Sequence, residues 1–274
     1  MSRIIAITNQ KGGVGKTTTA INLAACLARA MSRVMLVDID PQGNATVGSG
    51  VAMRDLEQGV YEVLLGEVDI EQALVKTASN YDLLPSHPDL SGAQVEMQDL
   101  SQRDYRLKQA LERVSDNYDF IIIDCPPALN VLTVNALAAA REVLIPVQCE
   151  YYALEGLTSL METIVLVRQG LNPELKLLGL IRTMYDRRNS LSEEVSEQLG
   201  EHFENRLFRT VIPRNVRLAE APSYGKPAIE YDRHCAGSQA YLALACEVLR
   251  RDRYDPELQE GNSQAEISPT LSTK

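Results

Sequence analysis

Short runs of consecutive apolar residues alternate along this chain with longer stretches of helical character. Most of the runs are rich in Ile, Val and Leu at neighbouring positions, as expected for strands buried on both faces of a parallel sheet. The runs lie at Arg3–Thr8, Arg33–Asp40, Tyr118–Pro127, Glu142–Gln148 and Leu175–Thr183. This alternation predicts an α/β fold of three layers, in which helices cover both faces of a twisted, mostly parallel sheet.

The helical stretches and the end of the chain define the predicted domain organisation. Helices are expected at Lys16–Ala30, Val131–Ala140, Leu154–Gly170, Ser190–Phe203 and Ala236–Arg250, with a late strand at Arg206–Ile212. No internal repeat or low-complexity linker divides the first 250 residues, so we predict one domain over residues 1–251. Residues 252–274 are acidic, poor in apolar residues and without periodicity, which predicts a disordered tail.

Composition and charge argue against several classes of protein. The chain has no run of roughly eighteen apolar residues and no signal-peptide pattern, so we expect a cytoplasmic protein without a membrane span. Its five cysteines form no C-x-x-C pair, which favours buried, reduced thiols over disulfides or a metal site. A net charge of -10 argues against a surface coated in positive charge for nucleic acid, but it is compatible with a local basic patch.

The segment NQKGGVGKTTTA, residues 9–20, has the context of a phosphate-binding loop but departs from the usual pattern. It lies between the first predicted strand and the first predicted helix, as such a loop requires. In the pattern G-x-x-x-x-G-K-[ST] a glycine would occupy position 10, where this chain has Gln10 followed by a second lysine, Lys11. Glycine turns and helix N-termini present N–H groups to phosphate oxygens. Lys16 is therefore expected at the β- and γ-phosphates, and the Thr17 hydroxyl at Mg²⁺.

Aspartates end two other predicted strands. Asp38 and Asp40 lie at the end of the second strand, and Asp124 ends the apolar run that begins at Phe120. Ligands bind at the carboxyl ends of strands in open parallel sheets, so these carboxylates are expected beside the phosphate loop. There they would position Mg²⁺ or the attacking water, and Asp124 has the form of a Walker B residue. A purely structural role is a plausible alternative for one of Asp38 and Asp40, but a weaker one for both.

Several segments together resemble the deviant Walker A class of P-loop ATPases that includes ParA and MinD, and in particular the ParA/Soj chromosome-partitioning ATPases. The segments are KGGVGKTT, VDIDPQGNAT, LLPSHPDLSGAQVEM, IIIDCPPALNVLTVNAL, PVQCEYYALEGL, TMYDRRNSL and VIPRNVRLAEAPSYGKP, and the resemblance covers about residues 4–250. The chain departs from the family at Met31-Ser32, where a glycine commonly ends the first helix. It also has Ala128-Leu129-Asn130 where Ser-Leu-Gly usually follows the double proline.

The resemblance implies a deviant P-loop NTPase fold and a Mg²⁺-dependent ATPase. Its implied catalytic residues are Lys11, Lys16 and Asp40, and its implied Mg²⁺ ligands are Thr17, Asp40 and Asp124. The implied ATP-binding residues are Lys11, Gly12, Gly13, Val14, Gly15, Lys16, Thr17 and Thr18, with Pro213 beside the adenine. In this family the signature lysine, here Lys11, reaches across an ATP-sandwich homodimer to the phosphates of the partner's nucleotide, as an arginine finger does. A solvated loop lysine is the alternative interpretation.

Seven arginines lie between positions 182 and 217, with six acids among them. A charge-mixed surface is one interpretation of this composition. The resemblance implies another, because Soj-like proteins use arginines in this region to bind DNA; Arg188 and Arg217 match best, with Arg187 and Arg214 as their neighbours. No interleaved aromatics or reading helix are evident, so binding to double-stranded DNA is expected to be sequence-independent. A dimer would combine two such patches and so strengthen weak phosphate contacts.

As a function, the resemblance implies a dimeric, nonspecific DNA-binding ATPase of chromosome or plasmid partitioning. It would be associated with the nucleoid, and a ParB-type partner would stimulate its slow ATP hydrolysis. The chain starts at its first strand, which favours the small ParA or Soj-like type over the larger plasmid type with a helix-turn-helix extension.

Three other functions are alternatives. A MinD-like, membrane-associated positioning ATPase needs a C-terminal amphipathic helix, whereas the tail here is acidic and contains proline. A metabolic or redox relative, such as the nitrogenase iron protein or dethiobiotin synthetase, is the second; the iron protein needs cysteines that bridge a cluster, and Cys125 has no second cysteine in the matching pattern. A non-catalytic, ATP-gated scaffold stays open, because Lys11 and Asp40 serve both interpretations.

Overall fold

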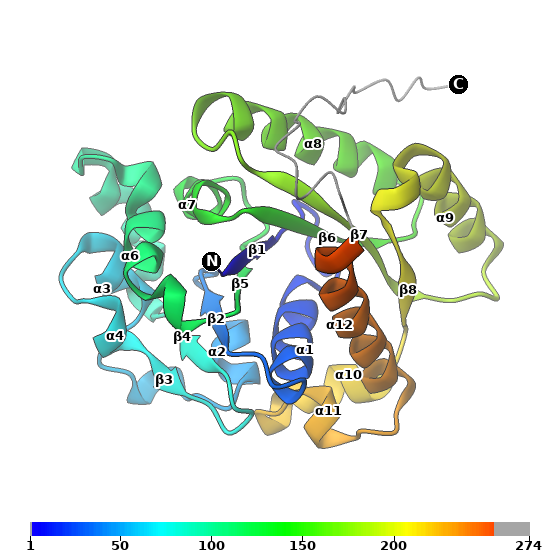
Figure 1. Ribbon diagram of the computed structural model, residues 1–274, viewed down its shortest axis with the longest axis horizontal. Helices are drawn as coiled ribbons and strands as arrows, with labels where there is room; N and C mark the ends of the chain where they lie inside the picture. The colour runs from blue at the N-terminus through cyan, green and yellow to red at the C-terminus, as the bar shows by residue number, and fades with distance from the viewer. Residues whose placement is uncertain (1, 255–274) are drawn as a thin grey trace.

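The computed structural model of the chain describes residues 2–254 and contains an eight-stranded sheet (Figure 1). In chain order the strands are β1 (Arg3–Ile7), β2 (Val34–Asp38), β3 (Val75–Lys76), β4 (Asp82–Leu84), β5 (Phe120–Asp124), β6 (Glu142–Gln148), β7 (Lys176–Tyr185) and β8 (Leu207–Pro213). They lie side by side in the order β3-β4-β2-β5-β1-β6-β7-β8. Every neighbouring pair is parallel except β3 and β4. The prediction of a mostly parallel α/β sheet is confirmed.

Helices cover both faces of this sheet (Figure 1). They are α1 (Lys16–Arg29), α2 (Asn44–Gly48), α3 (Val60–Leu65), α4 (Ile70–Ala73), α5 (Ala93–Glu96), α6 (Arg106–Val114), α7 (Val131–Ala139), α8 (Ala153–Gly170), α9 (Ser190–Phe203), α10 (Val216–Glu220), α11 (Ala228–Tyr231) and α12 (Ala236–Tyr254). The apolar residues of α3 to α9 belong to one buried cluster, and those of α1 and α10 to α12 belong to another. The three predicted layers are therefore present.

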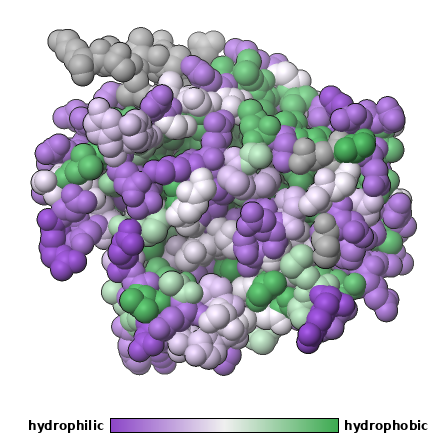
Figure 2. Space-filling view, turned by 180° about the vertical axis from the view of Figure 1, so that it is seen from behind, coloured by the Kyte–Doolittle hydropathy of each residue, from purple (hydrophilic) through white to green (hydrophobic). Residues whose placement is uncertain are grey.

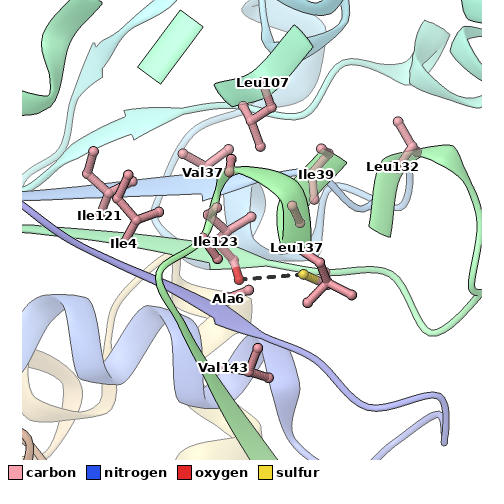
Figure 3. Packing of buried hydrophobic residues seen from close by; sticks show 14 of the residues in the cluster. Ile4, Ala6, Val37, Ile39, Leu107, Ile121, Ile123, Leu132, Leu137 and Val143 are labelled. Carbon is pink, nitrogen blue, oxygen red and sulfur yellow. Dashed lines mark hydrogen bonds between the residues drawn. The ribbon is translucent and has the colours of Figure 1, made fainter. Parts of the chain in front are cut away.

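The two cores follow from the alternation of side chains along each strand. In β1, Ile4 and Ala6 enter one cluster, whereas Ile5 and Ile7 enter the other. Successive side chains of a strand point to opposite faces, so a strand covered on both faces must be apolar at consecutive positions. Figure 3 shows Ile4 and Ala6 packed with Ile121, Ile123 and other residues of the first cluster.

Short elements between β2 and β5 were not predicted from the sequence. Apart from α6, the helices of this segment have six residues or fewer and β3 has two, which is too short to show a clear period. Helix α6 has nine residues with buried Leu107, Leu111 and Val114 at helical spacing, a period that was not recognised in the sequence. The last helix was predicted to end at Arg250 but continues to Tyr254, so residues 252–254 of the predicted tail are helical. The rest of that predicted tail, residues 255–274, lies outside the described residues. That the domain is a single one over residues 1–251 stays a prediction.

The end of α1 explains one departure from the family pattern. Met31 has a φ of 66° and is 91% exposed. This left-handed conformation after a helix is typical of glycine, because a side chain makes it strained. This chain therefore has a methionine in a backbone conformation that glycine adopts without strain. At the second departure, the side chain of Asn130 accepts hydrogen bonds from the N–H groups of Leu132 and Thr133 and so caps α7.

The surface of the described residues is mixed in polarity. Figure 2 shows hydrophobic side chains in separate patches between hydrophilic ones, which is ordinary for a folded domain. Of the helices within residues 2–254, none combines the length and the apolar character needed to cross a bilayer. All five cysteines are free thiols; Cys26, Cys125 and Cys149 are buried as predicted, whereas Cys246 is exposed.

Candidate nucleotide-binding site

The loop that connects β1 to α1 lies at the carboxyl-end edge of the sheet, with β5 and β6 on either side of β1. Gly13 and Gly15 have φ values of 74° and 89°, which only glycine adopts without strain. A side-chain carbon at Gly12 or Gly13 would meet no atom of the described residues within 4 Å, so this face of the loop is open. Gly15 begins α1 without a side-chain cap, and the first turn contains no acid. The N–H groups of that turn are therefore available to an anion.

Lys16 and Thr183 hold the loop in this conformation. The ammonium group of Lys16 donates to the carbonyl oxygen of Lys11 at 3.2 Å, and the residue is buried. Burial lowers the pKa of Lys16, whereas the negative charges of Asp124 and Asp40 oppose that shift. The Thr183 hydroxyl, near the end of β7, donates to the carbonyl oxygen of Val14 at 2.7 Å. Thr183 is within a segment quoted for the resemblance, but its contact with the loop depends on the position of β7.

The other residues of the predicted ATP site lie at the same edge of the sheet. Thr17 and Thr18 are half-buried in the first turn of α1, and Gly12 is exposed. Pro213 ends β8 in register with Tyr185 of β7. Both strand ends face the same edge of the sheet as the phosphate loop.

Two buried carboxylates lie side by side at the ends of β2 and β5. Asp38 and Asp124 are partners in the parallel register, and both are fully buried. Three hydrogen bonds stabilise the Asp38 carboxylate. Its oxygens accept from the N–H and the hydroxyl of Thr46 and from the N–H of Asp40. Burial raises the pKa of Asp38, and these hydrogen bonds partly oppose the rise. Asp38 therefore has the structural role that was the alternative for one of the two aspartates.

Asp124 has no such compensation. Within residues 2–254, neither of its buried carboxylate oxygens has a partner at hydrogen-bonding geometry. Burial raises its pKa well above the usual range, and the adjacent Asp38 adds to the rise. The Thr17 side chain lies close enough to lower this pKa, without meeting the geometry of a hydrogen bond. An unpartnered buried carboxylate is costly unless a bound group complements it.

These residues fit a Mg²⁺ ion bound together with a nucleotide. Mg²⁺ prefers oxygen ligands and is usually held by one or two carboxylates, water and substrate phosphates. The Asp124 carboxylate supplies two oxygens without hydrogen-bond partners beside the Thr17 side chain. In the part of the chain that the structure describes, no group of three or more His, Cys, Asp or Glu side chains could hold a metal ion by itself. Phosphates and water would therefore have to complete the coordination.

Asp40 lies two residues beyond the end of β2 and is 7% exposed. Its Oδ1 accepts a hydrogen bond from the N–H of Gln42 at 3.0 Å. Asp40 raises the pKa of both Asp38 and Asp124 through its charge, which indicates that the three carboxylates are close together. The structure thus brings together Lys16, Asp40 and Asp124, as the sequence pattern predicts.

Lys11 forms an ion pair with Glu150, a residue that was not selected from the sequence. The ammonium group of Lys11 lies 2.6 Å from Oε2 of Glu150, in the connection after β6. Both side chains are partly exposed, at 38% for Lys11 and 47% for Glu150. Glu150 is within the segment PVQCEYYALEGL that was quoted for the resemblance. Only the adjacency of β6 and β1 shows that it faces the phosphate loop.

The four arginines predicted to bind DNA follow β7 and β8, which are neighbouring strands. All four are exposed. Arg188 donates a hydrogen bond to Asp186 at 2.8 Å, and Arg188 together with Arg214 lowers the pKa of Asp186 to about 2. The structure therefore brings Arg214 near the Arg187-Arg188 loop.

Acidic partners reduce the free positive charge of these four arginines. Arg188 pairs with Asp186, and Arg217 pairs with Glu220 at 2.8 Å and with Asp232 at 3.6 Å. Within the described residues, no ion pair occupies Arg187 or Arg214. The charge-mixed surface is therefore part of the correct description of this region.

Comparisons with known proteins agree with this geometry. The chain matches the family model of an AAA domain over residues 2–177. The chromosome partitioning protein ParA of Caulobacter vibrioides is 54% identical over 254 residues, which is 92% of this chain and 95% of that protein. The sporulation initiation inhibitor protein Soj of Bacillus subtilis is 54% identical over 249 residues, which is 90% of this chain and 98% of that protein. A crystal structure of cobyrinic acid a,c-diamide synthase from Mycobacterium smegmatis, with bound ADP and magnesium, has a TM-score of 0.82 and 39% identity, and the match covers 93% of this chain and 96% of that one.

Proposed function

The chain belongs to the ParA/Soj family of chromosome-partitioning ATPases, and we propose that it is an ATP-controlled dimer that binds DNA without sequence preference. In this proposal two copies bind ATP face to face, the dimer binds DNA, and a ParB-type partner stimulates hydrolysis and release. ATPase activity in general is supported by the family. The dimer, the DNA, the partner and the dependence on Mg²⁺ are parts of the proposal.

One observation carries the proposal for the chemistry. The uncapped N-terminus of α1, buried Lys16, and the carboxylates of Asp40 and Asp124 meet at one edge of the sheet. Lys16 would hold the β- and γ-phosphates, and Asp40 would orient the attacking water. When bound, Mg²⁺ supplies charge neutralisation at the phosphates, and Thr17, Asp40 and Asp124 would hold it directly or through water.

The contact between Lys11 and Glu150 is compatible with a role of Lys11 in a second subunit. An ion pair with this much exposure contributes only about 0.2–1 kcal/mol. The ion pair orients Lys11 but is weak enough to break, because a triphosphate carries far more negative charge than one carboxylate and would attract the lysine more strongly. We therefore propose that Lys11 leaves Glu150 when a partner's nucleotide comes within reach.

The proposed DNA surface consists of Arg187, Arg188, Arg214 and Arg217. Two of these arginines have acidic partners, so one protomer offers few uncompensated charges. Each phosphate contact adds to a salt-dependent, sequence-independent affinity, and doubling the contacts in a dimer multiplies their effect. Weak binding by a monomer and useful binding only by the ATP dimer follow from this arrangement.

Fluorescence anisotropy with a labelled duplex of arbitrary sequence tests this surface. We expect binding with ATP, little binding with ADP, and a loss of about tenfold or more in affinity for the Arg187→Ala/Arg214→Ala double variant at moderate salt. A matched control is Arg33→Ala/Arg113→Ala, which removes the same charge from arginines that precede β2 and β5 and should change the affinity little. Equal binding with ATP and ADP, or equal losses in the two double variants, would contradict the proposal.

The alternatives are separated by simple assays. Recruitment to anionic vesicles with ATP, in place of DNA binding, would favour a MinD-like function. Tight ATP binding and DNA release without any hydrolysis would favour the scaffold. The amide synthesis named for the structural relative has less support, because that protein is 39% identical, whereas relatives at 54% over nearly their whole length are named for partitioning.

A further inference from the structure

The backbone of Asp40 is hydrogen-bonded on both sides by buried groups. Its N–H donates to Oδ1 of Asp38 at 3.2 Å. Its carbonyl oxygen accepts from the Ser86 hydroxyl at 2.7 Å and from the Gly43 N–H at 2.9 Å. Ser86 is 46 positions away in sequence, in the connection that follows β4, so this contact joins two separate segments.

Thr46 of α2 closes these contacts into a ring. Its hydroxyl donates to Oδ2 of Asp38 at 2.7 Å and accepts from the Ser86 N–H at 2.9 Å. The Thr46 N–H also donates to Oδ2 of Asp38 at 2.7 Å. Asp38, Thr46 and Ser86 are all fully buried. Buried hydrogen-bond networks in which every member has a partner are rigid, because a lost contact leaves a polar group without water to replace it.

The direction of the Asp40 side chain depends on this ring. The Asp40 carboxylate accepts a hydrogen bond from the N–H of Gln42, a residue of the same turn. Its position therefore depends on the backbone of residues 40–42, and that backbone depends on Asp38 and Ser86. Displacement of a catalytic group by about 1 Å is enough to reduce a rate by up to roughly 100-fold.

We propose that Thr46 and Ser86 are positioning residues for ATP hydrolysis, which hold the backbone of Asp40 so that its carboxylate remains directed at the attacking water. This inference rests on the proposed role of Asp40 in hydrolysis. Among residues 2–254, neither Thr46 nor Ser86 has a hydrogen bond to the phosphate loop, so both act through Asp40 and leave nucleotide binding unchanged.

The test is steady-state ATP hydrolysis by the full chain, together with binding of a nonhydrolysable ATP analogue. Thr46→Val removes the hydroxyl and keeps the size of the side chain and its N–H. We expect its kcat to fall about 10- to 100-fold, with KM and analogue affinity within about twofold of the wild type. Thr46→Ser keeps the hydroxyl and should restore kcat to within about threefold. Ser86→Ala provides a second variant, and a fall in kcat without a change in KM is expected there as well.

A matched control separates loss of positioning from loss of a buried hydroxyl. Thr19 is fully buried, and its hydroxyl is hydrogen-bonded to Tyr241 at 3.1 Å, away from Asp40. Thr19→Val should therefore lower the melting temperature without lowering kcat. Should Thr46→Val fail to fold by circular dichroism, the same comparison is made between Ser86→Ala and Thr19→Val.

Two results would overturn the inference, and a third would contradict the proposed function instead. Wild-type kcat in folded Thr46→Val and Ser86→Ala would show that the ring does not position Asp40. A loss of analogue affinity equal to the loss of rate would show that the ring only supports the fold of the site. Wild-type hydrolysis by Asp40→Ala would refute the role of Asp40 itself, whatever the ring variants do.

Discussion

Replacing Asp124 with Asn should make the protein more stable without ligand and less responsive to Mg²⁺ and ATP. Both oxygens of the Asp124 carboxylate are fully buried and have no hydrogen-bond partner among the described residues. An unsatisfied buried polar group costs about 1–3 kcal/mol, and a charged group costs more. The amide of the Asp124→Asn variant has the same shape and is still polar, so the substitution relieves only the cost of the buried charge, and a gain of about 1–3 kcal/mol in the free energy of unfolding is expected.

The gain should depend on pH in a defined direction. Burial and the adjacent Asp38 raise the pKa of Asp124 in the folded protein above its value in the unfolded chain. The folded state therefore binds the proton more tightly, and the wild type loses stability as pH rises through the raised pKa. Below the unfolded pKa, both states are protonated and the variant has no such advantage. The stabilisation by Asp124→Asn should thus be larger at about pH 8 than at about pH 5.

Differential scanning fluorimetry in EDTA measures this effect. For a chain of this size, about 1–3 kcal/mol corresponds to a rise of roughly 2–12 °C in Tm. With Mg²⁺ and ATP at about 100 times Kd, the wild type should gain about 2.7 kcal/mol, and the variant distinctly less. Asp116→Asn is the control, because Asp116 is exposed on the same stretch of chain. A lower Tm for Asp124→Asn in EDTA at about pH 8 would refute the reasoning, since it would mean that the carboxylate is compensated in solution.

Three further substitutions test other parts of the structure. Lys16→Ala should weaken ATP binding by about 100-fold or more in isothermal titration, because about 3 kcal/mol of charge-assisted hydrogen bonding to phosphate is lost; unchanged affinity would contradict the assignment of the loop. Met31→Gly should raise Tm by about 1–4 °C, since it relieves the left-handed conformation of an exposed side chain, and a lower Tm would show that Met31 is not strained. Gly225→Ala should destabilise the protein by about 2 kcal/mol or more in urea denaturation, because Gly225 has a φ of 60° and its new carbon would lie 2.7 Å from the Cα of Gly50. In the same assay Gly200→Ala, in open space on α9, should be neutral or stabilising; equal losses in both glycine variants would contradict this account of the contact.

Long elements with a clear pattern could be predicted from the sequence. The consecutive apolar residues of β1, β2, β5, β6 and β7 require burial on both faces, and this requirement already implies the layers of helices. Helix α9 was predicted with its observed bounds, because Asn189 caps its start and its apolar residues recur at helical spacing. Between β2 and β5 only α6 has such a pattern, with Leu107, Leu111 and Val114 at helical spacing, and it was missed. The other elements there are too short for one, and tertiary packing rather than local preference determines their conformation.

In the candidate site, too, some features could be predicted from the sequence and others could not. The proximity of Lys16, Asp40 and Asp124 could be predicted, because each lies near the end of a strand or at the start of a helix, at one edge of the sheet. Glu150, Thr183 and Ser86 could not be selected, although each is in a segment with family resemblance. Their contacts with the loops of Lys11, Val14 and Asp40 arise from the order of the strands in the sheet, which has no local signature.

The acidic partners of the arginines show a further limit. The sequence shows that acids intervene between Arg182 and Arg217, but it does not show that Asp186 folds back on Arg188. It also does not show that Asp232, which follows α11, approaches Arg217. A count of charges along the chain therefore overstates the positive charge that this surface leaves without an acidic partner.

In the proposed mechanism Lys16 holds the nucleotide of its own subunit, whereas Lys11 contacts the nucleotide of a second subunit. Sedimentation velocity with ATP, on Asp40→Ala to slow hydrolysis, tests it most directly when combined with Lys11→Ala. We expect Asp40→Ala to be a dimer with ATP and a monomer with ADP. We expect Asp40→Ala/Lys11→Ala to remain monomeric with ATP while it still binds ATP with nearly unchanged affinity. A dimer of undiminished stability in the double variant, or loss of ATP binding by the monomer, would contradict these roles of the two lysines.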